Sequence, residues 1–166
     1  METYSPDDIM RLITCKKRTV EPPKKEMKLE RGSLRNDMTL ESEDGAERFS
    51  VFMRKNQAFP ENFSIGLRYH SKDGQSFALL RCNGPHGQHV DLEVEPGSHY
   101  TYHVHQARAD RLNEGNFSER YATVTDGYAS YEEAMSYFIK EVGIVDADRH
   151  FAPHILQLTL FTEEGY

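Results

Sequence analysis

The chain has 166 residues, of which 37% are hydrophobic, and its formal net charge is −7. This length suits one folded domain over residues 1–166, and the 9 Phe and 9 Tyr exclude a chain that is disordered throughout. The acidic balance argues against broad electrostatic binding of nucleic acid, although it leaves room for a local basic site.

The N-terminus predicts a short helix over residues 6–14. Ser5 suits the N-cap, Pro6 the first helical position, and Asp8 the third residue after the cap. Lys16-Lys17-Arg18 follow the helix, where positive charge is favoured. The chain start has no signal-peptide pattern, and no apolar run approaches the roughly 18 residues that span a bilayer. We therefore expect a cytoplasmic protein without a membrane segment.

Residues from about 25 to 107 alternate apolar and polar side chains with the period of two that is typical of strands. The expected strands cover residues around 27–29, 38–40, 48–55, 63–70, 76–82 and 100–107. Gly32 and Asn36-Asp37 are expected to form the turn between the first two of them. Hairpin-length links join antiparallel neighbours, so this sheet core is predicted to be an antiparallel meander.

The second half of the chain is less regular. Residues 108–128 are polar and predict a long excursion from the sheet. Ser130-Tyr131-Glu132-Glu133 predicts a capping box that opens a helix over residues 130–142. Residues 155–161 alternate and predict a last strand, followed by a frayed tail over 162–166. The predicted fold class is α+β: a mostly antiparallel β-meander sheet with the N-terminal helix and the helix near 130–142 packed on one face.

Histidine is concentrated in one part of the chain, because six of the eight lie between His70 and His105. Imidazole binds metals, moves protons and holds phosphate near neutral pH. His103 and His105 are two residues apart on an expected strand, so both side chains lie on one face, about 7 Å apart. The turn-forming Asn83-Gly84-Pro85-His86 follows the preceding strand and can place His86 beside them.

Two arginines are candidates to hold a phosphate near these histidines, because a guanidinium group binds phosphate oxygens bidentately. Arg68 lies on the polar face of its strand. Strict alternation puts Arg81 on the face of Phe77 and Leu79, so its side chain is expected to emerge only at the strand end. The predicted substrate-binding residues are Arg81, Arg68 and Asn83.

Three interpretations of the cluster stay open. The first is a phosphodiester site, in which His103 and His105 act as general base and acid with help from His86 and no cofactor is required. The second is a divalent-metal site with the same three histidines, or with His89, as ligands. In the third, the histidines are structural and the protein is a non-enzymatic interaction or regulatory module.

The stretch Arg81-Cys82-Asn83-Gly84-Pro85-His86, followed by Tyr102-His103-Val104-His105, resembles small uncharacterised bacterial proteins with an Arg-x-Asn-Gly-Pro-His … His-x-His signature. It resembles more distantly the Arg-Tyr-Asp-Asn-x-Pro-His stretch of the TumE-like toxins of toxin–antitoxin systems. The resemblance covers about residues 49–142. The spacing from Arg81 to Pro85 is one residue shorter than in those toxins, and Gly87 replaces their second histidine.

This resemblance implies a bacterial cytoplasmic protein of a toxin or defence locus that acts on RNA and has a protein antitoxin as its partner. The sequence as a whole therefore predicts an RNA-cleaving or phosphodiesterase activity at the His/Arg site. The metal site and the structural module are the alternatives.

Overall fold

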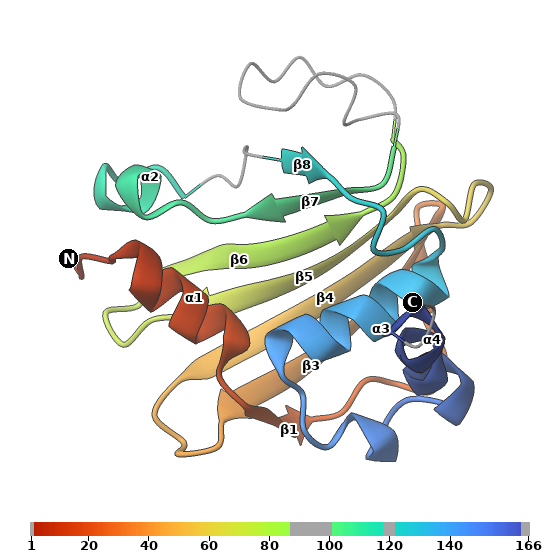
Figure 1. The fold of residues 1–166 in the computed structure, drawn as a ribbon, viewed down its shortest axis with the longest axis horizontal. Helices are drawn as coiled ribbons and strands as arrows, with labels where there is room; N and C mark the ends of the chain where they lie inside the picture. Colours follow the sequence, from red (N-terminus) through yellow and green to blue (C-terminus); the bar gives the residue numbers. More distant parts are fainter. Residues whose placement is uncertain (1, 87–100, 118–121, 164–166) are drawn as a thin grey trace.

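The computed structural model describes residues 2–86, 101–117 and 122–163. Their fold is α+β, as predicted: an eight-stranded antiparallel sheet with four α-helices (Figure 1). Among the described residues, no helix combines the length and the apolar composition that crossing a bilayer requires.

Hairpins build most of the sheet. Its strands are β1 (Lys17–Glu21), β2 (Lys28–Glu30), β3 (Ser33–Ser42), β4 (Arg48–Asn56), β5 (Phe63–His70), β6 (Ser76–Asn83), β7 (His103–Gln106) and β8 (Ala122–Val124). Their order across the sheet is β1-β3-β4-β5-β6-β7-β8, and β2 pairs with the other end of β3. Every pairing of these strands is antiparallel, so the predicted meander is confirmed.

Two of the four described helices, α1 and α3, begin at signals that the sequence carries. They are α1 (Pro6–Thr14), α2 (Ala109–Asn113), α3 (Tyr131–Val142) and α4 (Pro153–Glu163). At α1 the predicted capping pair is present: the Asp8 amide donates to Ser5 Oγ at 3.1 Å, and the Ser5 amide donates to Asp8 Oδ2 at 2.8 Å. At α3 only half of the predicted box forms, because Glu133 accepts from the Ala129 amide instead of the Ser130 amide.

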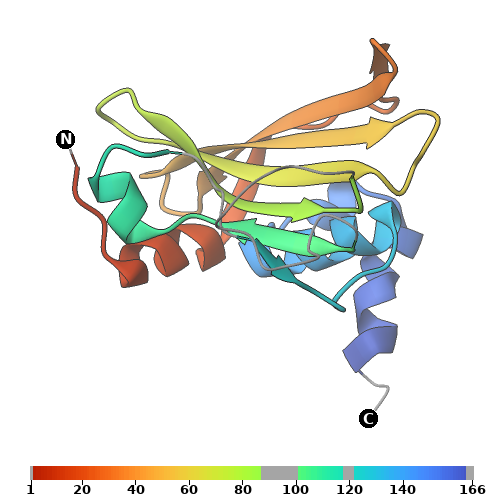
Figure 2. The same ribbon diagram turned by 90° about the horizontal axis from the view of Figure 1, so that it is seen from above.

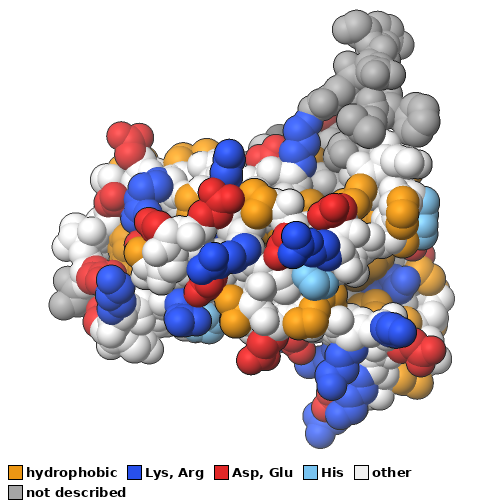
Figure 3. Space-filling model, turned by 90° about the horizontal axis from the view of Figure 1, so that it is seen from below, with side chains coloured by type: hydrophobic (Ala, Val, Ile, Leu, Met, Phe, Trp, Pro, Cys, Tyr) orange, Lys and Arg blue, Asp and Glu red, His pale blue; other side chains and the backbone are white. Residues whose placement is uncertain are grey.

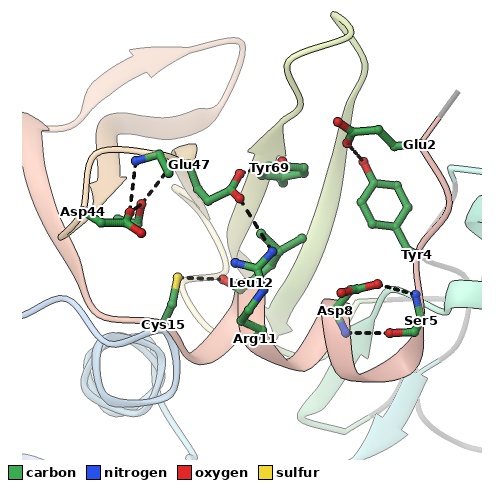
Figure 4. A network of polar contacts seen from close by, with 12 residues as sticks. Glu2, Tyr4, Ser5, Asp8, Arg11, Leu12, Cys15, Asp44, Glu47 and Tyr69 are labelled. Atoms are coloured by element: carbon green, nitrogen blue, oxygen red, sulfur yellow. Dashed lines mark hydrogen bonds and ion pairs between the residues drawn. The ribbon is translucent and has the colours of Figure 1, made fainter.

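Helices α1 and α3 lie on the same face of the sheet (Figures 1 and 2). The core between the two layers contains Phe49, Ile65, Leu67 and Phe138, all fully buried. A polar network also joins α1 to the sheet (Figure 4). In it, Arg11 lies 3.6 Å from Glu47, which accepts a 2.7 Å hydrogen bond from the Tyr69 hydroxyl. No described helix lies over the opposite face of the central strands (Figure 2).

Lys17 is fully buried where α1 and α3 end together. Its ammonium group donates to the carbonyl oxygens of Ile13 at 2.7 Å, Cys15 at 2.8 Å and Val142 at 2.7 Å. The terminal carbonyls of a helix have no partner within the helix, and a cation there is favoured by the helix dipole. One side chain therefore caps two helices. The ring of Phe49 adds a cation–π contact at 4.7 Å.

Three predictions about secondary structure are wrong. Residues 155–161 belong to helix α4; five of these seven residues are apolar, and a short segment of this composition fits a helix as well as a strand. Thr162 and Glu163 of the predicted tail also belong to α4, and residues 164–166 lie outside the described residues. Asn36-Asp37 form no turn and lie within β3; the turn is at Arg31-Gly32, both with positive φ (50° and 79°), as a two-residue hairpin loop requires. The polar excursion over 108–128 contains α2 and β8.

Candidate metal centre

Two neighbouring strands supply most of the site. In the register of β6 and β7, Asn83 lies opposite His103, and Arg81 lies opposite His105. Between the two pairs, Cys82 and Val104 face the core. Because side chains alternate along a strand, these four side chains point to the opposite face, the one without helices. Opposed side chains of antiparallel strands have Cβ atoms within about 5.5 Å of each other, so the four form one group.

A tight turn brings His86 to the same place. After β6 the backbone passes so close to the chain before β5 that a Cβ on Gly84 would lie 1.8 Å from the Glu61 carbonyl oxygen. The Gly84 amide donates to the Phe63 carbonyl oxygen at 3.0 Å and ties the turn to β5. Pro85 follows with its restricted φ, and the His86 ring then reaches β7. The turn therefore requires glycine for steric reasons.

The rings of the three histidines converge. The Nε2 atoms of His86 and His103 are 3.0 Å apart, and one ring nitrogen from each of His86, His103 and His105 lies within 4.8 Å of the other two. Two imidazole ligands of a tetrahedral zinc ion are about 3.3 Å apart, since each is about 2.1 Å from the metal. The nitrogens of His86 and His103, 3.0 Å apart, are close to this spacing. A side-chain movement of roughly 1–2 Å brings the His105 nitrogen to the same distance.

A hydrogen bond fixes the tautomer of one of the three rings. His103 Nδ1 lies 2.9 Å from the Thr101 carbonyl oxygen, which can only accept, so in the neutral ring Nε2 carries the lone pair. The Ser64 hydroxyl donates to Asn83 Oδ1 at 2.9 Å, which orients the Asn83 amide nitrogen toward His86 Nε2 at 3.4 Å. His86 Nε2 can then either donate its N–H to His103 Nε2 or, as the other tautomer, share a cation with it.

The three histidines are buried to different extents. His103 is 0% exposed and His105 is 6% exposed, whereas His86 is only partly buried. A metal-ligating histidine typically donates its other ring N–H to a carbonyl or carboxylate, as His103 does to Thr101.

Tyr128, which lies just before α3, holds the backbone behind the site. Its hydroxyl lies 3.0 Å from the Asn83 carbonyl oxygen and 2.8 Å from the His103 carbonyl oxygen, one on each of the paired strands. The ring is buried against the aromatic side chains of Phe63 and Tyr137. Sequence reasoning gave Tyr128 no role at the site, because no local pattern reveals a contact across 25 or 45 residues.

We expect Tyr128→Phe to lower the free energy of unfolding by about 1–2 kcal/mol, because the two carbonyl groups lose their shared donor. Urea denaturation measures the change. Tyr137→Phe is the matched control: its ring belongs to the same aromatic cluster, and we expect a change below about 0.5 kcal/mol. Equal effects of the two substitutions would show that the Tyr128 hydroxyl does not hold the strands together.

A β-bulge determines where Arg81 points. The register of β5 and β6 shifts between Leu67 and Arg68, so Phe77 faces the core while Arg81, opposite Gly66, faces the histidines. The prediction that Arg81 shares a face with Phe77 is therefore wrong. A bulge adds one residue to a strand and reverses the alternation beyond it, which periodicity alone does not reveal.

The other predicted residues do not join the three histidines. Arg68 is on the same face as Arg81 but one strand away, where its guanidinium lies 3.4 Å from the Ser76 hydroxyl. His70 is exposed at the far end of β5 and contacts Ser50 at 2.8 Å, so it does not join the trio. Burial, and then the Arg68 charge, lower the pKa of His70. The alternative ligand His89 lies outside the described residues.

Comparison of the chain with protein-family models, with curated proteins and with solved structures gives no significant match. The interpretation of the site therefore depends on its geometry.

Proposed function

We propose that the protein binds a divalent transition-metal ion through His86, His103 and His105 and uses it to hydrolyse a phosphate ester. The observation that carries this proposal is the convergence of three ring nitrogens within 4.8 Å of one another, with the Nε2 atoms of His86 and His103 3.0 Å apart. Structural zinc sites are closed by four protein ligands, whereas catalytic sites have three and leave one position open. The three histidines among the described residues match the catalytic type.

The chemistry follows from the ligand set. Held by these three neutral imidazoles, a zinc ion would supply a water acidic enough to act as a nucleophile near neutral pH. Arg81 lies opposite His105 in the register and provides a guanidinium group for the phosphate oxygens of a substrate. This pairing of nucleophile and cation supports a phosphate ester as the substrate class.

The same distances favour the metal over a pair of imidazoles that work alone. A general base and a general acid must each reach a different proton of the substrate. The His86 and His103 nitrogens contact each other, and His103 is fully buried. A phosphate group does not fit between two nitrogens at this separation.

Metal binding is the direct test. After dialysis against a chelator, we expect the full chain to bind one Zn²⁺ in calorimetry, with a rise in melting temperature. We expect His103→Ala to weaken the affinity by at least about 100-fold, because a ligand and its anchored ring are lost. His70→Ala is the control, since His70 is an exposed histidine on the same sheet face. Unchanged zinc affinity in His103→Ala would contradict the proposal.

The resemblance to bacterial toxins extends the proposal to an RNA substrate, a cytoplasmic setting and a protein antitoxin as partner. Expression in a bacterial host tests this extension separately. Growth arrest that His103→Ala relieves and His70→Ala does not relieve would support it. Growth arrest that persists in His103→Ala would reject the histidine trio as the cause.

A further inference from the structure

Arginine is concentrated on the sheet face that the described helices leave uncovered. The register of the central strands puts five arginines and two acidic residues there: Arg35, Arg48, Arg54, Arg68, Arg81, Asp37 and Glu41. The chain as a whole has a net charge of −7, so the excess of negative charge lies elsewhere. The β2–β3 end projects from the rest of the molecule in Figure 2, and Figure 3 shows Lys and Arg side chains gathered at this projection.

An aromatic ring lies in the middle of this basic face. Phe52 covers Gly66 so closely that a Cβ on the glycine would lie 2.1 Å from a ring atom. The Arg54 guanidinium lies 5.3 Å from the ring centroid, within the range of a cation–π contact. Phe52 is only partly buried, and its side chain points away from the core between the sheet and the helices.

The sheet register connects this ring to the histidines. Phe52, Gly66, Arg81 and His105 lie opposite one another on four successive strands. Neighbouring strands are about 4.8 Å apart, so the row extends about 14 Å from the ring to the metal centre. Because Gly66 has no side chain, no group stands between Phe52 and Arg81 in this row.

We infer that this face binds single-stranded nucleic acid and delivers its backbone to the histidine trio. Unpaired bases stack on aromatic rings and guanidinium planes, and arginines neutralise the phosphates. Phe52 with Arg54 provides the stacking surface, and Arg68 and Arg81 provide the phosphate contacts. An acidic protein segment would need the charges but not the ring, and duplex nucleic acid would not offer its bases. The inference depends on the proposed function because it names the substrate class of the same site.

Fluorescence anisotropy tests the inference with a labelled single-stranded RNA of about 12 nucleotides at about 50 mM salt. EDTA is present, so binding is measured without metal and without cleavage. We expect the variant Arg54→Gln/Arg68→Gln to bind at least tenfold more weakly and to show a shallower salt dependence. We expect Phe52→Leu, which keeps Gly66 covered, to lose at least about fivefold in affinity.

The matched control is Arg11→Gln/Arg149→Gln, with Arg11 on α1 and Arg149 exposed in the 3-10 helix Ala147–Arg149 that follows α3. It removes the same charge outside the strands of this face and should bind like the wild type. An equal loss in this control would overturn the inference, because the binding would then be non-specific. Binding of a poly-glutamate of equal charge as tightly as RNA would overturn it in favour of a protein partner. No binding of RNA would also overturn it. Zinc affinity, measured on the same samples without EDTA, shows independently whether the metal proposal holds.

Discussion

We expect Lys17→Met to lower the free energy of unfolding by about 3 kcal/mol. Methionine keeps the apolar stem but leaves the carbonyl oxygens of Ile13, Cys15 and Val142 without their ammonium donor. A buried polar group without a partner costs about 1–3 kcal/mol. Urea denaturation at neutral pH measures the change, and Lys16→Met is the control, because Lys16 is adjacent and exposed. A loss below about 1 kcal/mol would contradict the capping role.

The same site predicts a pH dependence. Burial lowers the pKa of Lys17 to about 8, whereas a lysine in the unfolded chain titrates near about 10.4. Between these two values the unfolded chain binds a proton that the folded chain does not, so a rise in pH favours the folded state. The stability difference between the wild type and Lys17→Met should therefore grow from about pH 8 to pH 10. A difference that shrinks over this interval would show that the hydrogen bonds to the three carbonyls keep the Lys17 ammonium group protonated in the folded protein.

The central hairpins were the part of the fold most open to prediction. The expected strands 48–55, 63–70 and 76–82 differ by at most one residue at either end from β4, β5 and β6. Their alternation and their turns are local features, and one buried face fixes the register. The N-terminal helix is equally local, since Ser5, Pro6 and Asp8 specify its start.

Two features that the sequence did not reveal are decided by tertiary contacts. Helix α4 packs against α3, and its apolar sequence alone is compatible with either structure. The basic run after α1 indicated only a favourable charge near a helix end. Lys17 is buried because Val142, 125 residues away, ends α3 beside the end of α1.

In the candidate site, too, features set by the local sequence were predicted and features set by the fold were not. Alternation was enough to put His103 and His105 on one face, and turn composition was enough to direct His86 toward them. The bulge that turns Arg81 toward the histidines has no signal in the alternation. Tyr128, which supports the site from behind, comes from a distant segment, so only the fold reveals its role.

We expect Gly84→Ala to impair both stability and metal binding. The new Cβ would lie 1.8 Å from the Glu61 carbonyl oxygen and 2.9 Å from the Phe63 ring, so the backbone of the turn has to move. Overpacking of this kind costs about 1–3 kcal/mol, and a clash with backbone belongs at the upper end of that range. Because His86 is two residues further on, its Nε2 moves away from the 3.0 Å contact with His103.

Gly66→Ala is the control that separates the loss of stability from the loss of metal binding. Its Cβ would lie 2.1 Å from a Phe52 ring atom, and a partly exposed side chain can rotate away where a backbone carbonyl cannot. We therefore expect a smaller loss in urea denaturation than for Gly84→Ala, and an unchanged zinc affinity. For Gly84→Ala we expect zinc affinity to fall by at least about tenfold, since a shift of about 1 Å misplaces a ligand. Normal zinc affinity in a destabilised Gly84→Ala protein would show that the trio does not need this turn, which would count against His86 as a ligand.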